Sequence, residues 1–188
     1  MRHHIAPAFR LMLVLTVLTG LVYPGVVTAL CQVLFRWQAN GSMSKVDGKE
    51  IGSAVIGQNF MKPEYFHPRP SAAGNGYDAT ASGGSNLAQS NKTLVARIQG
   101  DIDKLAAQNH GKPVPIDMVT TSGSGLDPDI TPDNADYQVP RVAQARGITD
   151  QDRLRKLIAD HTTPRQLGIL GEPRVNVLEL NLALDQLK

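Results

Sequence analysis

The sequence predicts a single N-terminal transmembrane helix followed by one mixed α/β domain outside the cytoplasm. Three features lead to this fold class: a long uncharged run near the N-terminus, later apolar residues at helical spacing, and short strand-like pieces between them. A chain of 188 residues has room for one ordinary domain besides the span. Its single cysteine excludes an internal disulfide framework and a cysteine-built metal site.

The uncharged run extends from Leu11 to Phe35, between Arg10 and Arg36. A helix of this length measures about 37 Å, enough to cross a hydrocarbon core of roughly 30 Å with some tilt. Trp37 follows where an amphipathic ring prefers the membrane interface. We therefore predict a membrane helix over residues 11–35.

A cleaved signal peptide is the alternative interpretation of this run. Val27, Thr28 and Ala29 resemble a cleavage site, and cleavage there would release a free-standing periplasmic binding protein. The apolar run continues past Ala29 to Phe35, however, which is long for a signal peptide. Its length favours an uncleaved anchor.

Charge predicts the orientation of the chain. Arg2 and Arg10 precede the span without an acidic neighbour, so we expect residues 1–10 to stay in the cytoplasm. Residues 36–188 then form the extracytoplasmic domain, in which basic and acidic residues cancel. Nucleic-acid-binding proteins carry a concentrated basic patch, so we expect no nucleic-acid partner.

Thr16, Gly20 and Pro24 share one face of the predicted membrane helix because they are spaced four residues apart. Small residues let another helix approach closely, and a proline within the membrane frees a carbonyl that neighbours must satisfy. We predict that this face packs against another helix. A kinked anchor in the lipid bilayer without such a partner is the alternative.

Four helices are predicted in the body from apolar residues at helical spacing and from cap residues. Asn91 caps the first helix, and Thr131, followed by a first-turn proline, caps the second. Thr149, with Asp152 three residues later, and Asn176, also with an acid three residues later, open the other two. The expected helices cover residues 91–111, 131–147, 149–161 and 176–187.

Short strands are expected between these helices. Residues 53–56 form an apolar piece with a glycine on each side, and residues 114–121 alternate between apolar and polar side chains. The leucines of residues 178–184 also alternate, so a strand is the alternative to the last helix. Helices interleaved with a few short strands are typical of a mixed α/β domain.

Acidic residues gather in residues 113–140, which contain five aspartates and no basic residue. Such a segment draws cations towards whatever it faces, so we predict that Asp127, Asp133 and Asp136 attract cations. A solvated loop whose acids cap helix starts is the alternative. The glycine and the bidentate acid of a calcium loop are replaced by Pro132 and Gln138, so no metal site is predicted.

No enzyme signature is found. The glycine-rich runs at residues 82–86 and 122–125 lack the lysine and hydroxyl of a nucleotide-phosphate loop. His67, His110 and His161 have no neighbouring acid and serine that would indicate a nucleophilic site. The residues alone therefore predict a membrane-anchored extracytoplasmic interaction domain without a catalytic residue.

Seven motifs follow one another from the end of the span to the C-terminus. In order, they are WQANGS (37–42), GS with IGQNF (52–60), YFHPRPSA (65–72), SGGSNL (82–87), VTTSGSGLD (119–127), YQVPRVA (137–143) and VNVLELNLAL (175–184). Together they resemble the KdpC family, the single-span C subunits of bacterial Kdp potassium-transporting P-type ATPases.

The resemblance implies a complex of four subunits, with a channel-like potassium subunit, a P-type ATPase subunit that uses ATP, and another small single-span subunit. We expect this chain to be non-catalytic, without a tightly bound cofactor, in the bacterial inner membrane. It would stabilise the channel-like and ATPase subunits at the outer potassium entrance. The alternative that the family suggests is a catalytic chaperone that binds nucleotide and raises the ATP affinity of the ATPase subunit.

Two segments are predicted either to dock the domain on a partner or to hold its shape. Arg69 offers a planar fork for carboxylate or carbonyl groups. Internal stabilisation of the subunit is as strong an interpretation as docking. The residues concerned are Phe66, Arg69 and Ser71 in the first segment and Gly83, Gly84, Ser85 and Asn86 in the second.

Overall fold

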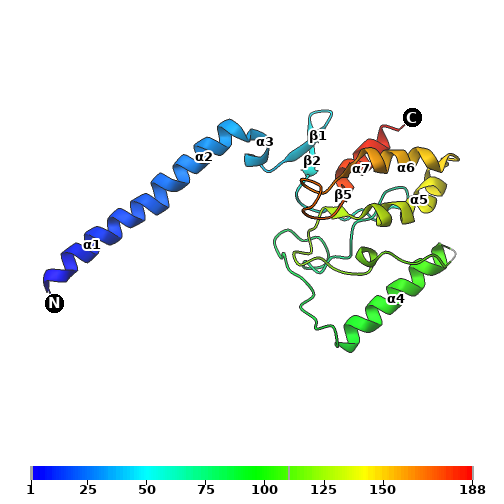
Figure 1. Cartoon of the computed structure of the whole chain (residues 1–188), viewed down its shortest axis with the longest axis horizontal. Coiled ribbons are helices and arrows are strands. Elements are labelled where there is room, and N and C mark those ends of the chain that lie inside the picture. The colour runs from blue at the N-terminus through cyan, green and yellow to red at the C-terminus, as the bar shows by residue number, and fades with distance from the viewer. Residues whose placement is uncertain (1, 110, 188) are drawn as a thin grey trace. The chain divides into compact units, whose positions relative to one another are not determined.

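The computed structural model of the chain describes residues 2–109 and 111–187. Outside this description lie three residues and two further side chains: Met1, His110 and Lys188, and the side chains of Arg2 and His3. The chain forms two compact units, which meet in the sequence between Ile51 and Gly52 (Figure 1). The fold class agrees with the prediction, because an apolar N-terminal helix precedes a mixed α/β region.

The first unit begins with a long helical segment of three parts. Helix α1 (Arg2–Val17), the π-helical turn η1 (Leu18–Val22) and α2 (Tyr23–Leu34) follow without a break. Within it, the 31 residues His4–Leu34 are long and apolar enough to cross a membrane. The hydroxyl of Thr16 donates to the carbonyl of Met12 over 2.8 Å, so this polar group is satisfied within its own helix. The boundaries at residues 11 and 35, drawn from charge, stay predictions.

The turn η1 accommodates Pro24. Proline lacks a backbone N–H, and its ring collides with the carbonyl four residues earlier in a regular helix. Here the N–H of Tyr23 donates to the carbonyl of Leu18, five residues earlier, which widens the turn. The packing role of Thr16, Gly20 and Pro24 stays a prediction.

A short helix and a hairpin follow: α3 (Arg36–Ala39), β1 (Met43–Val46) and β2 (Lys49–Ser53). The strand predicted at residues 53–56 is wrong, because β2 ends where that segment begins. The missed signal is the pair Asp47 and Gly48, both with positive φ, at the turn. An Asp-Gly pair favours the tight turn whose twist matches paired strands.

The second unit contains four longer helices and a small antiparallel sheet of order β3-β5-β4. Figure 1 shows α5, α6 and α7 grouped around β5, with α4 at the edge of the unit. Residues 54–91 carry no helix or strand. The elements are α4 (Lys92–Gln108), the 3-10 turn η2 (Ile116–Met118), β3 (Asp129–Ile130), α5 (Pro132–Arg146), α6 (Gln151–Asp160), β4 (Thr162–Thr163), β5 (Arg174–Asn176) and α7 (Val177–Asp185).

Side-chain caps start these helices where the sequence indicates. Asn91, Thr131 and Asn176 each accept a hydrogen bond from a first-turn backbone N–H, which confirms three predicted caps. Helix α6 instead begins after Asp150, whose carboxylate accepts from the N–H of Asp152, so the predicted cap at Thr149 is one residue early.

Two strand assignments are corrected by the structure. Residues 114–121 contain η2 instead of a strand, because Pro113 and Pro115 have no N–H for a sheet ladder. Residues 178–184 lie in α7, so the strand alternative is wrong there. Leu180 and Leu184, one helical turn apart, are both fully buried, which is the periodicity of a helix face.

The hydrophobic core lies between α5, α6, α7 and the three-stranded sheet. Its largest side chain, Phe66, comes from the irregular segment and is fully buried. It belongs to the same cluster as residues from β3, α5, α6, β5 and α7, including Ile130, Val139, Val142, Leu154, Val175, Leu180 and Leu184.

Two side-chain amides satisfy the buried backbone around Phe66. The amide of Asn181 accepts from the N–H of Phe66 over 2.8 Å and donates to its carbonyl over 2.9 Å. The amide of Gln138 does the same for His67, at 2.7 and 3.0 Å. These bonds replace those that a neighbouring strand would form. We call Asn181 and Gln138 the amide clamp.

Substitution Asn181→Ala should lower the free energy of unfolding by at least about 2 kcal/mol, because two buried backbone groups lose their partner. Denaturant unfolding of the full chain in detergent measures this. Gln99→Ala is the matched control, because this amide lies at an exposed position of α4 and bonds only to the exposed Asp103 there. The control should stay within about 0.5 kcal/mol of the unsubstituted chain. An Asn181→Ala chain as stable as the control would contradict the clamp.

Candidate functional site

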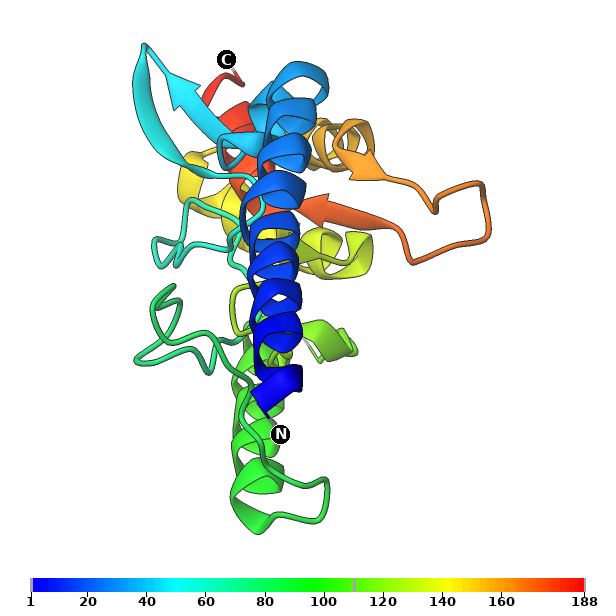
Figure 2. The same cartoon turned by 90° about the vertical axis from the view of Figure 1, so that its left-hand side faces the viewer.

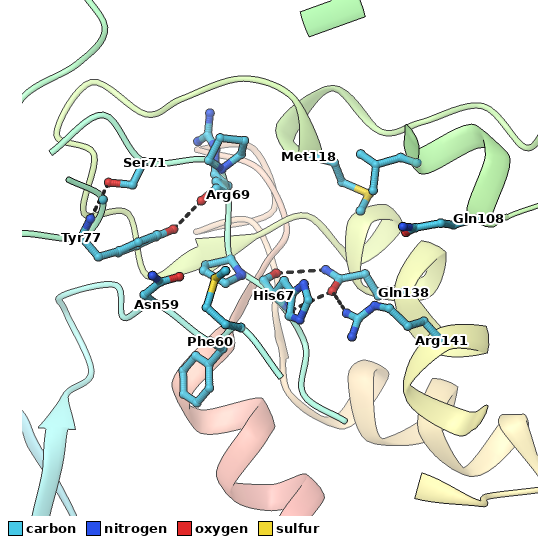
Figure 3. A pocket seen from close by; sticks show the side chains of 15 residues that line it. Asn59, Phe60, His67, Arg69, Ser71, Tyr77, Gln108, Met118, Gln138 and Arg141 are labelled. Atoms are coloured by element: carbon cyan, nitrogen blue, oxygen red, sulfur yellow. Dashed lines mark hydrogen bonds between the residues drawn. The ribbon is translucent and has the colours of Figure 1, made fainter. Parts of the chain in front are cut away.

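The segment held by the amide clamp forms one wall of a cavity of about 440 Å³. Figure 3 shows loop side chains on one side and side chains from α4 and α5 on the other. The wall from residues 59–77 includes Asn59, Phe60, His67, Arg69, Ser71 and Tyr77, and the opposite wall includes Gln108, Met118, Gln138 and Arg141.

Arg141 provides a fixed positive charge in this cavity. Its guanidinium donates to the carbonyls of Pro63 and Tyr65, at 2.5 and 3.0 Å, and to the amide oxygen of Gln138 at 2.5 Å. Burial lowers the pKa of Arg141 to about 10, so it remains charged at neutral pH. Because these three acceptors are neutral, the positive charge is not cancelled by them.

His67 lies beside this charge. Burial lowers the pKa of the His67 ring below its usual value, and the positive charge of Arg141 acts in the same direction. The ring is therefore neutral at neutral pH, and its Nε2 lies 3.0 Å from the carbonyl of Lys62. Arg69 also lines the cavity, but its charge is paired with Asp127. The cavity thus combines one arginine that has neutral acceptors, Arg141, with a neutral imidazole, which suits an anionic or carbonyl group better than a cation.

Metal binding is not indicated by the described residues, among which no group of three His, Cys, Asp or Glu side chains is placed to hold an ion.

The hydroxyl of Ser71 donates to the carbonyl of Gly125 over 2.6 Å and accepts from the N–H of Tyr77 over 2.8 Å. These bonds give Ser71 a role in shaping the loop.

The first predicted segment is joined to residues 122–127. Arg69 forms an ion pair with Asp127 at 2.8 Å, and both side chains are partly buried. The hydroxyl of Tyr77 donates to the carbonyl of Arg69 over 2.5 Å. Burial raises the pKa of Tyr77, and the charge of Asp127 adds to this, so the phenol keeps its proton to donate.

The second predicted segment meets the same loop. The N–H of Gly83 donates to the carbonyl of Ser124 over 2.8 Å. A Cβ on Gly84 would lie 3.3 Å from the carbonyl oxygen of Gly123, so the chain passes closely here. Asn86 has a φ of 53°, which asparagine tolerates better than most residues. These contacts lie inside the domain, and the docking role of both segments stays a prediction.

The three predicted cation-attracting acids do not form one cluster of carboxylates in the structure. Asp127 pairs with Arg69, and Asp136 pairs with Nε of Arg155 at 2.9 Å. Asp133 lies in the first turn of α5, where the helix dipole favours an acid. Two of the three charges are therefore partly neutralised by local arginines.

The amide clamp and the role of Asp117 were not predicted from the sequence. The carboxylate of Asp117 is buried and accepts from the N–H of Thr131 at 2.8 Å and from Nδ2 of Asn134 at 2.9 Å. Nε2 of Gln138 donates to Oδ1 of Asn134 over 2.7 Å, which links Asp117 to the clamp. Polar residues at apolar-face positions of two predicted helices, such as Asn181 between leucines, are the signal that could have found them.

The sequence model of the KdpC family, described as K+-transporting ATPase, c chain, matches residues 5–186. The chain is 55% identical over 185 residues to a protein of Koribacter versatilis (strain Ellin345), covering 98% of this chain and 95% of the relative. It is 53% identical over 200 residues to one of Rhodopseudomonas palustris (strain BisB18), covering 100% of both.

A protein of Caulobacter vibrioides (strain NA1000 / CB15N) is 56% identical over 186 residues, covering 98% of this chain and 94% of the relative. All three relatives bear the name Potassium-transporting ATPase KdpC subunit. The match covers both the apolar helix and the domain with its amide clamp, which confirms what the order of motifs indicates. The chain therefore belongs to the KdpC family of potassium-transporting ATPase subunits.

Proposed function

We propose that this chain is a non-catalytic accessory subunit that docks on the outer face of the channel-like subunit and stabilises the potassium entrance. The single N-terminal apolar helix, His4–Leu34, carries this proposal. Basic residues before such a span favour an N-terminus in the cytoplasm, which would put the domain across the membrane from ATP.

The internal contacts of the domain support a docking role. The amide clamp and the Arg69–Asp127 pair hold long irregular loops in one conformation. A surface ordered before binding loses less conformational entropy when it meets a partner. Any effect of this subunit on ATP use would then be a coupling between distant sites of the complex.

A catalytic chaperone that binds nucleotide is the second candidate. Arg141 favours it, because a guanidinium with neutral acceptors in a cavity of about 440 Å³ could also contact phosphate. This role needs the domain on the side of the membrane where ATP is. Orientation therefore separates the two candidates.

Protease protection of a C-terminally tagged chain, in the assembled complex and in cells with a permeable outer layer, measures this orientation. We expect external protease to remove the tag while an N-terminal tag on a second copy of the gene stays protected. Digestion of the C-terminal tag only after the inner membrane is broken would overturn the proposed docking site and favour the nucleotide-binding candidate.

Substitution Arg69→Ala should reduce the complex recovered from membranes and slow growth when potassium is limiting. The change removes an ion pair whose side chains are partly buried, so the free energy of unfolding should also fall by about 1–3 kcal/mol. Co-purification of the other subunits and thermal unfolding of the full chain measure the two effects. Arg155→Ala, which removes two more exposed pairs, with Asp136 and with Asp152, is the control. Normal assembly and growth of the Arg69→Ala chain would count against a docking role.

Combined substitution of Asp127, Asp133 and Asp136 by asparagine should raise the potassium concentration for half-maximal transport by roughly two- to tenfold, if these acids line the entrance. Potassium-dependent ATPase activity of the purified complex measures this. Combined substitution of Asp101, Asp103 and Asp160 by asparagine makes the same charge change elsewhere. An unchanged potassium dependence in an intact complex would leave the first three as ordinary loop acids.

A further inference from the structure

The loop between β4 and β5 projects from the second unit and carries large apolar side chains in solvent. Figure 2 shows this loop, in orange, reaching away from the helices. Every residue from Thr163 to Glu172 is exposed. At the tip, the exposed fractions are 88% for Leu167, 76% for Ile169 and 54% for Leu170. We call these three residues the apolar tip.

Backbone contacts give the loop a defined shape. Its stem is the antiparallel pair β4–β5, in which Thr163 lies opposite Arg174. Near the tip, Gln166 and Leu170 exchange two backbone hydrogen bonds of 2.8 and 2.9 Å. Between these two levels Arg165 pairs with Glu172. The loop is therefore a small hairpin that holds its tip in place.

Leu167, at the turn, has a backbone conformation that is unfavourable for its residue type in the isolated chain. Leu167 and Gly168 both have positive φ, at 53° and 76°. This left-handed conformation is ordinary for glycine and tolerable for asparagine, but it is strained for a bulky side chain. Leu167 gains neither burial nor turn propensity from its position. A strained backbone persists only where the surrounding hydrogen bonds enforce it, and such strain often has a functional role. The strain at Leu167 therefore points to a contact with a partner outside the domain.

The charge around the tip indicates what could cover it. Residues 166–171 carry no charge, and the flanking Arg165 and Glu172 neutralise each other. Surfaces that insert into lipid headgroups usually present aromatic side chains or excess cations. The apolar tip has neither, so its complement is an uncharged apolar pocket in a protein.

The size of the tip also restricts its partner. A standard interface buries about 800 Å² on each partner, far more than three side chains can supply. The tip alone therefore does not make a stable dimer of this chain. Instead it would form part of a larger interface, in which a few buried side chains contribute most of the binding free energy.

We propose that the apolar tip anchors the domain in an uncharged apolar pocket on the outer surface of the channel-like subunit. This inference rests on the proposed docking function and identifies the element that makes the contact. Because the hairpin is ordered in advance, insertion of Leu167 and Ile169 needs little rearrangement of the domain.

The double substitution Leu167→Asn with Ile169→Thr tests this proposal in the full chain, co-expressed with the other subunits. Asparagine suits the left-handed turn, so the thermal unfolding temperature of the chain should stay the same or rise. Recovery of the channel-like subunit with the variant should fall by roughly tenfold or more. Ile116→Thr is the matched control, because Ile116 is 75% exposed in η2, and it should leave recovery unchanged.

A photo-reactive phenylalanine analogue at position 169 identifies the contact directly in intact cells. We expect a cross-linked product that contains the channel-like subunit. Products with lipid alone, or with a second copy of this chain, would overturn the proposal, as would wild-type recovery with the double variant. These failures differ from failure of the docking function itself, which is read from protease protection of the unsubstituted chain.

Discussion

Burial of the polar backbone around Phe66 is the constraint on which the rest of the domain depends. The ring of Phe66 fills the core from a segment that has neither helix nor strand, so its N–H and C=O enter the core without regular partners. Unsatisfied, such groups would cost more than a typical hydrogen bond contributes. The amide clamp solves this, since one amide can donate and accept at once.

The clamp also determines where the loops lie. It fixes the start of the segment that continues to Arg69 and Ser71, and these residues in turn hold the glycine-rich loop 122–127. On the other side, Gln138 connects through Asn134, near the start of α5, to Asp117 in η2. One continuous polar network therefore joins the core to the cavity wall. Such networks specify a single arrangement when every member has a partner.

The domain thus has largely paired polar groups inside, with Nε of Arg69 as the unpaired exception among the described residues, and an ordered apolar tip outside. This is the reverse of what solubility alone would favour, because exposed aliphatic side chains at a strained turn stabilise nothing within the chain. An accessory subunit held to its complex by a membrane helix and by a second, rigid contact would use both features. In the proposed complex the interior would provide rigidity, and the hairpin would provide the place of contact.

By itself the sequence determined the features that depend on neighbouring residues. The apolar span follows from an uninterrupted uncharged run, and the caps at Asn91, Thr131 and Asn176 follow from short polar side chains just before the helical pattern. The partners of Phe66 and Arg69, in contrast, are 115 and 58 residues away. Only the tertiary structure decided these pairs, and likewise the exposure of Leu167. Local periodicity carries no information on which distant amide meets a buried backbone group, or on which apolar residue is left outside the core.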